Sequence, residues 1–197
     1  MTTKQLLPHQ IEDAEFLASK AFAGNFSGMG SGKTLTALEA FRLARELVTD
    51  QVIIVGPPIS LRMWASEFEA FFPGDKAQLV KTGKTKIDGS ASALVMSYEI
   101  ATKRAAELSQ LKARALILDE AHACKSVKAK RTKAILGSGG LVQLGEALVG
   151  LVPAPQRHVV AALQPALERL DGLRVVLERL VELIRAAVAD ADVEGRG

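Results

Sequence analysis

The fold of this 197-residue chain is decided by Gly28-Met-Gly-Ser-Gly-Lys-Thr34, which follows a short apolar run and opens a segment with helical periodicity. Glycines let the backbone turn its N–H groups inward, and the following helix N-terminus favours an anion. In such a loop Lys33 reaches the β- and γ-phosphates of a nucleotide, and the Thr34 hydroxyl ligates magnesium. The usual pattern has one more glycine, where this chain has Ser27. The predicted nucleotide-binding residues of the loop are Gly28, Met29, Gly30, Ser31, Gly32, Lys33 and Thr34.

A second informative segment is Ala115-Leu-Ile-Leu-Asp-Glu120, an apolar run that ends in two carboxylates. A nucleotide hydrolase needs one carboxylate to hold magnesium and another to activate the attacking water. Asp119 suits the first role and Glu120 the second. Alone, the pair could be a strand end exposed to solvent, but the phosphate loop upstream favours the catalytic interpretation.

Between these motifs, short apolar runs alternate with helix-period segments, which is typical of a parallel sheet covered by helices on both faces. We therefore predict an α/β fold in which ligands bind at the carboxyl ends of the strands. The expected strands are 21–26, 51–55, 93–97 and 115–118, and the expected helices are 8–20, 33–48, 60–72, 99–111 and 128–136.

The composition narrows the class of protein. With 48% hydrophobic and 24% charged residues, the chain is not disordered throughout, and no apolar run approaches the roughly 20 residues that span a bilayer. The single cysteine, Cys124, permits no internal disulfide. The N-terminal residues lack the pattern of a signal peptide. We expect no membrane association and an intracellular, cytoplasmic location.

The composition changes near residue 140, because Lys, Ser, Thr, Asn, Met, Cys, Phe, Tyr and Trp are all absent from 141–197. The Gly-Ser-Gly-Gly stretch before it is typical of a linker. Apolar residues at helical spacing over about 168–190 predict an amphipathic helix. We therefore expect a lobe over 1–136, a Gly-rich linker over 137–140 and a helical tail over 141–197.

Taken together, the motifs resemble those of the superfamily-two helicases, specifically the Swi/Snf-type DNA-dependent ATPases. The phosphate loop is similar to the family's first motif, and Asp119-Glu-Ala-His122 to its second. Three more segments match, so that the resemblance covers about residues 5–136. They are Leu7-Pro-His-Gln10, Val55-Gly-Pro-Pro-Ile-Ser-Leu61 with Trp64 and Glu67 behind it, and Val95-Met-Ser-Tyr-Glu99.

The resemblance implies a RecA-like P-loop lobe that binds ATP and Mg²⁺ and works with DNA, in duplex form. It implies that Lys33 and Glu120 are catalytic and that Thr34 and Asp119 hold the metal. The resemblance further implies that Gln10 recognises adenine and that His122 couples the nucleotide state to the nucleic-acid side. It implies DNA contact for Ser60, Leu61 and Tyr98. Trp64 itself is expected in the core, because aromatic side chains bury large apolar areas.

Family members carry two lobes, and no second lobe fits within the 57 residues after residue 140. The segment Gly150-Leu-Val-Pro-Ala-Pro155 is the nearest candidate for the family's Ser/Thr-Gly-Thr-Pro motif, and it lacks both hydroxyl residues. The tail is therefore a native helical cap, the end of a short protein that borrows a second lobe from another chain, or the product of a reading-frame shift. Two other functions stay open: a non-hydrolysing, nucleotide-dependent module that docks on a protein partner, and, less in keeping with Trp64 and Glu67, a P-loop kinase.

Overall fold

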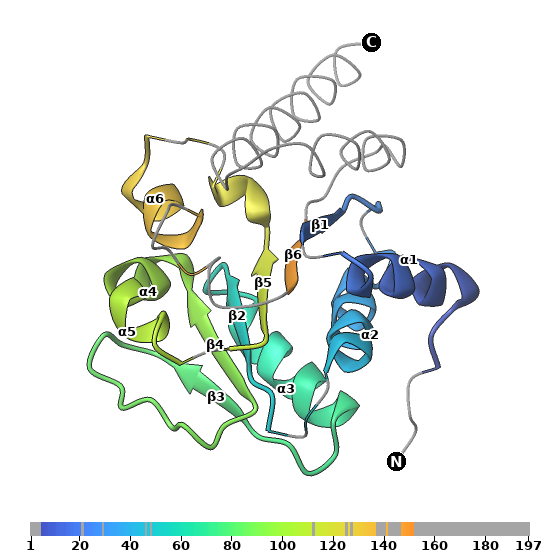
Figure 1. Ribbon diagram of the computed structural model, residues 1–197, viewed down its shortest axis with the longest axis horizontal. Helices are drawn as coiled ribbons and strands as arrows, with labels where there is room; N and C mark the ends of the chain where they lie inside the picture. Colours follow the sequence, from blue (N-terminus) through green and yellow to red (C-terminus); the bar gives the residue numbers. More distant parts are fainter. Residues whose placement is uncertain are drawn as a thin grey trace.

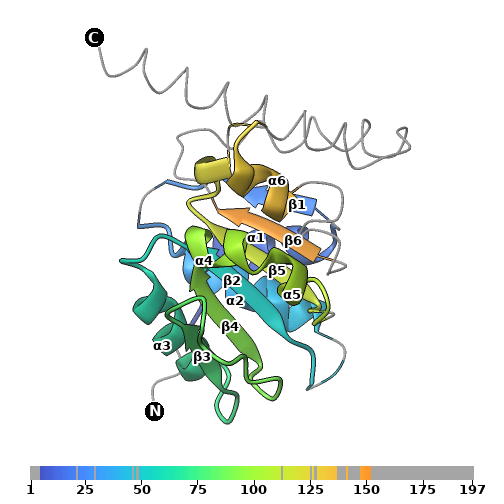
Figure 2. The same cartoon turned by 90° about the vertical axis from the view of Figure 1, so that its left-hand side faces the viewer.

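The described residues form a six-stranded parallel sheet with the strand order β1-β6-β5-β2-β4-β3 (Figure 1). The strands are β1 Phe22–Asn25, β2 Val52–Gly56, β3 Ala77–Val80, β4 Ala93–Ser97, β5 Ala115–Asp119 and β6 Ala147–Leu151. The computed structural model describes residues 5–20, 22–28, 30–45, 47, 49–111, 113–124, 126, 128–136, 141 and 147–151. Figure 2 shows the strands following one another in a twisted stack from β3 to β1.

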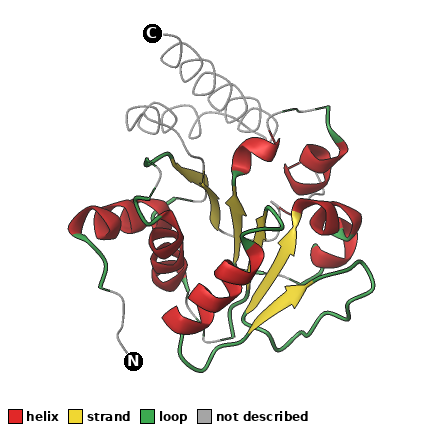
Figure 3. Ribbon diagram, turned by 180° about the vertical axis from the view of Figure 1, so that it is seen from behind, coloured by secondary structure: helices red, strands yellow, loops and turns green. Residues whose placement is uncertain are grey.

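Helices cover both faces of this sheet (Figure 3). They are α1 Pro8–Ala18, α2 Lys33–Ala44, α3 Leu61–Phe71, α4 Tyr98–Lys103, α5 Ala105–Leu108 and α6 Lys130–Leu136, and a 3₁₀ turn, η1, spans Ala121–Cys124. The predicted α/β fold, with a parallel sheet between two helical layers, is confirmed.

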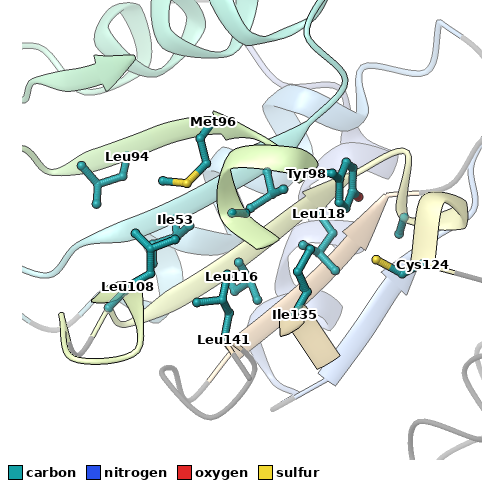
Figure 4. Close-up of a cluster of buried hydrophobic side chains, with 14 of the residues drawn as sticks. Ile53, Leu94, Met96, Tyr98, Leu108, Leu116, Leu118, Cys124, Ile135 and Leu141 are labelled. Carbon is teal, nitrogen blue, oxygen red and sulfur yellow. The ribbon is translucent and has the colours of Figure 1, made fainter. Parts of the chain in front are cut away.

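The alternation of side chains along the strands divides the core in two. On β2, Ile53 and Val55 point to the layer formed by α4, α5 and α6, whereas Val52 and Ile54 point to α1, α2 and α3. All four side chains are fully buried, as expected for central parallel strands with both faces covered. Figure 4 shows the first of these clusters, with Tyr98 and Cys124 at one end of it.

The helices begin and end close to the predicted positions, with one exception. The expected helix over 99–111 is two short helices, because the backbone at Arg104 leaves helical geometry between α4 and α5. The sequence analysis also missed β3. This edge strand of four residues, Ala77–Val80, contains only one β-branched residue, so its pattern gave no strand signal.

The strand β6 corrects the predicted tail. Residues 147–151 were expected in a helical tail, yet they form a strand between β1 and β5 and pair in parallel with both. The run Ala-Leu-Val-Gly-Leu is too short and too uniformly apolar for its periodicity to distinguish helix from strand. The predicted linker 137–140 and the helix over 168–190 lie outside the described residues. Within the part of the chain that the structure describes, no helix is long and apolar enough to cross a membrane.

Candidate nucleotide-binding site

The predicted motifs meet at one edge of the sheet. All strands are parallel, so their carboxyl ends lie together, and the loops that leave them share this edge. The phosphate loop follows β1 and the acidic pair follows β5, with β6 lying between these two strands. The order of the strands therefore brings together two motifs that are about ninety residues apart in the sequence.

The phosphate loop has the backbone conformation that its glycines allow. Gly30 and Gly32 have φ angles of 75° and 80°, in the left-handed region that other residues rarely adopt. Gly32 is the N-cap of α2, so the helix begins at Lys33. The first N–H groups of an α-helix have no acceptor within the helix, which leaves them available to an anion at this position.

Lys33 folds back over the loop. Its Nζ donates to the backbone carbonyls of Ser27 and Gly28, each at 2.8 Å. Burial lowers the pKa of Lys33, while the negative charges of Glu120 and Asp119 act in the opposite direction. The largest of these effects is burial, so the pKa of Lys33 is lowered despite the two carboxylates.

Gln10 connects α1 to the phosphate loop. Its Oε1 accepts from the N–H of Leu7 at 2.9 Å, and its Nε2 donates to the carbonyl of Ser31 at 2.9 Å. The side chain is only 5% exposed. The predicted role of Gln10 in adenine recognition stays a prediction, and the side chain has a structural role that the sequence analysis missed.

The two carboxylates at the end of β5 differ in environment. The Asp119 side chain accepts hydrogen bonds from Ser60 and Trp64, and its backbone carbonyl accepts one from the Tyr98 hydroxyl at 2.8 Å. The Glu120 side chain is 37% exposed, and its Oε2 lies 3.1 Å from Nδ1 of His122. Glu120 also has a φ of 54°, which is strained for a residue with a side chain.

Of the three residues for which the resemblance implies DNA contact, Ser60 and Tyr98 donate hydrogen bonds to Asp119. Ser60 bonds to Asp119, whereas the side chains of Leu61 and Tyr98 are buried. Tyr98 packs under the guanidinium of Arg131, whose carbon lies 5.5 Å from the ring centre. The expected burial of Trp64 is confirmed, but its indole N–H also reaches the carboxylate, a contact that spacing alone could not reveal.

The residues present fit a nucleotide with magnesium. The Ser31 Oγ is buried in the phosphate loop without a hydrogen-bond partner among the described residues, and such atoms are rare unless a ligand pairs with them. The described residues contain no group of three His, Cys, Asp or Glu side chains that could hold a metal. Magnesium at phosphate sites needs only one or two protein side chains, which Thr34 and Asp119 supply by type. Thr34 is half-buried at the start of α2, and Met29 lies outside the described residues.

Comparison with known proteins identifies relatives of this chain. A family model described as the SNF2-related domain matches residues 9–138. The chain is 28% identical over 137 residues to the ISWI chromatin-remodeling complex ATPase ISW1 of Saccharomyces cerevisiae, a match covering 62% of this chain and 12% of that protein. It is 28% identical over 160 residues to the chromatin-remodeling ATPase INO80 of Sclerotinia sclerotiorum, with 70% of this chain and 9% of that protein covered.

A solved structure, the Sulfolobus solfataricus SWI2/SNF2 ATPase core in complex with dsDNA, superposes with a TM-score of 0.67 at 17% identity. The match covers 94% of this chain and 44% of that one, and at this identity it shows the fold. The chain spans only about a tenth of the length of the curated relatives named above. The matched region of the family model includes Gln10, the phosphate loop and the acidic pair. The resemblance to the Swi/Snf-type ATPases is therefore confirmed, and the chain belongs to the SNF2-related domain family.

Proposed function

We propose that this chain is an ATP-binding lobe that holds ATP with Mg²⁺ and, together with a second lobe, couples ATP hydrolysis to movement along duplex DNA. The observation that carries the proposal is the meeting of the phosphate loop and the acidic pair at one edge of the sheet, close enough for both carboxylates to influence Lys33. Family membership supports the same activity.

Each residue has a chemical task in this proposal. The Lys33 ammonium exchanges the carbonyls of Ser27 and Gly28 for phosphate oxygens, and the N–H groups of the loop bind the same phosphates. Thr34 and Asp119 hold the magnesium ion, which when bound neutralises developing charge on the phosphates. Glu120 accepts the proton of the attacking water, and His122 links that carboxylate to the DNA side of the lobe.

Duplex DNA is the proposed partner, contacted through phosphates rather than base edges. The segment from Ser60 to Met63 supports this placement, because it lies at the edge that carries the nucleotide residues. Leu61 is buried there, so the exposed and positively charged Arg62 is the better phosphate contact in this segment.

A second lobe remains part of the proposal, because the arginine fingers that stabilise the transition state come from outside this lobe and raise the rate about 10³–10⁵-fold. We also propose that the lobe continues through β6 to residue 151 rather than ending at 136. Translation of the coding DNA in its other two frames tests the frameshift origin of the remaining tail. If neither frame restores a Gly-Thr-Pro segment, that origin is rejected.

The decisive experiment measures binding of a fluorescent ATP analogue and ATP hydrolysis by this chain, with and without magnesium and duplex DNA. We expect magnesium-dependent binding in the wild type, loss of binding in Lys33→Ala, and retained binding without hydrolysis in Glu120→Gln. Turnover that rises with duplex DNA indicates a working motor site, in which self-association or the tail supplies the missing groups. Binding without turnover leaves an isolated lobe or the non-hydrolysing module, and a wild type that binds no nucleotide contradicts the proposal.

A further inference from the structure

The carboxylate of Asp119, the proposed magnesium ligand, accepts hydrogen bonds from two side chains of one short segment. Oδ2 of Asp119 accepts from the Ser60 Oγ at 2.8 Å and from the Trp64 Nε1 at 2.9 Å. Ser60 is the N-cap of α3 and Trp64 lies in its first turn, so the start of this helix presents both donors. Donors to a carboxylate form stronger hydrogen bonds than donors to a neutral group.

Trp64 is the less ambiguous donor of the two. The Ser60 hydroxyl has a second acceptor, the Pro57 carbonyl at 3.1 Å, and only one proton to share between them. The indole N–H can only donate, and Asp119 is its acceptor. The ring is fully buried among Leu61, Phe68 and other side chains of the α1–α3 core, which fixes the direction of that N–H.

The remaining contacts of Asp119 also restrict where its carboxylate lies. The Tyr98 hydroxyl bonds to its backbone carbonyl, and Gly56 at the end of β2 lies so close that a Cβ there would be 3.0 Å from the Asp119 Cβ. Both side-chain donors use Oδ2, and among the described residues no donor bonds to Oδ1. One oxygen is thus fixed by the protein while the other remains for a ligand.

We propose that Trp64, assisted by Ser60, is a positioning residue for the metal-holding carboxylate of Asp119, in addition to its place in the core. This inference rests on the proposed function, because it requires that Asp119 faces magnesium bound with a nucleotide. Partners that orient metal ligands through hydrogen bonds commonly change metal affinity about 10–100-fold when they are removed.

The chain offers a direct test, because a phenylalanine at position 64 keeps an aromatic ring but lacks the N–H. The affinity for a fluorescent ATP analogue is measured in excess EDTA and over a magnesium titration, for wild type and Trp64→Phe. We expect about a tenfold higher magnesium concentration for half-saturation in Trp64→Phe. Affinity in EDTA is expected to stay within about twofold, because the phosphate loop is unchanged.

Two control variants separate positioning from packing. Phe68→Leu disturbs the same buried cluster on the same helix but removes no donor to Asp119. Equal magnesium defects in Phe68→Leu and Trp64→Phe would overturn the inference in favour of packing alone. Ser60→Ala is expected to raise the magnesium concentration for half-saturation, and Ser60→Thr, which keeps the hydroxyl, to bring it back toward the wild-type value.

A second measurement needs no substitution in the core. Trp64 is the only tryptophan in the chain, so its emission reports on the surroundings of this one indole. Addition of magnesium with ATP is expected to change the emission of the wild type, and ATP in EDTA to change it much less. Unaltered emission at saturating, magnesium-dependent binding would overturn the inference even if Trp64→Phe failed to fold. Nucleotide binding without any magnesium dependence would instead contradict the proposed function itself.

Discussion

The side-chain amide of Gln10 lies in the space that a Cβ atom on residue 32 would occupy. Gly32 has a φ of 80°, so a larger residue there meets both a strained backbone and a collision with Gln10. We expect Gly32→Ala to lower the free energy of unfolding by about 2 kcal/mol, measured by urea denaturation.

The collision can be isolated by a double-mutant cycle. Gln10→Ala removes the side chain that a new Cβ would meet, but it leaves the backbone strain at residue 32 in place. The cost of Gly32→Ala should therefore be smaller, by about 1 kcal/mol, in the Gln10→Ala background than in the wild type. Strictly additive effects would show that the Gln10 amide has room to move aside.

Glu120 gives a prediction about backbone strain. Glu120→Gly and Glu120→Ala remove the same carboxylate and both should abolish hydrolysis. Since φ at this position is 54°, we expect the glycine variant to be more stable than the alanine variant by about 1 kcal/mol. Thermal unfolding of the two variants side by side checks this. At most other positions alanine is the more stable, so the opposite order would contradict a strained residue here.

Cys124 should be chemically inert in the folded protein. Burial raises the pKa of its thiol to about 12, and the thiolate is the reactive form. At about pH 8.5, the ordinary pKa of a cysteine, alkylation should be at least a hundredfold slower in the native chain than in concentrated guanidinium chloride. Cys124 is the only cysteine in the sequence, so the rate of thiol alkylation reports on this site alone. Equal rates in the two conditions would mean that the thiol is exposed.

Asp75 gives a prediction about pH. The guanidinium of Arg45 donates to this carboxylate and holds the pKa of Asp75 below its ordinary value of 3.8. A lowered pKa contributes stability above the ordinary value and loses it as the pH falls through the folded value. Asp75→Asn should therefore cost about 2 kcal/mol near neutral pH, and the deficit should disappear as the pH falls below the ordinary range of Asp.

An exposed pair provides the matched control for Asp75. Glu99 and Lys103 form an ion pair on α4 in which both side chains are well exposed, at 73% and 64%. Glu99→Gln is the same chemical change, but surface pairs contribute little. We expect little or no change in the free energy of unfolding. An equal loss at both positions would show that the Asp75 contact has no special role.

The sequence predicted where the phosphate loop and the acidic pair stand relative to their strands, because the signals for both motifs are local. Gly28 to Thr34 lie next to one another, and Asp119 and Glu120 end an apolar run, so each motif is recognisable from its own neighbours. Trp64 and Ser60 are different, because each contacts a residue far away in the sequence. Asp119 lies 55 positions after Trp64 and 59 positions after Ser60. Nothing in the spacing of α3 specifies which acceptor its indole N–H meets.

The sequence analysis failed to predict the strand β6 for a related reason. Its five residues, Ala147–Leu151, show no alternation of apolar and polar residues that separates strand from helix, and they lie in a segment whose composition resembles a helical tail. Its identity as a strand depends on two partners, β1 and β5, that are far away in the sequence. Tertiary pairing thus determined what local propensity left undetermined.

The position of β6 also has a consequence for how the protein is made. In the described sheet β1 pairs only with β6, so the strand that carries the phosphate loop has no neighbour until the last strand of the sheet has been synthesised. At roughly 5–20 residues per second, the ribosome needs about 6 to 25 s to pass from residue 25 to residue 151. During that interval the β1 edge is open to other extended chains. We therefore expect chaperones to bind the nascent chain before β6 pairs with β1.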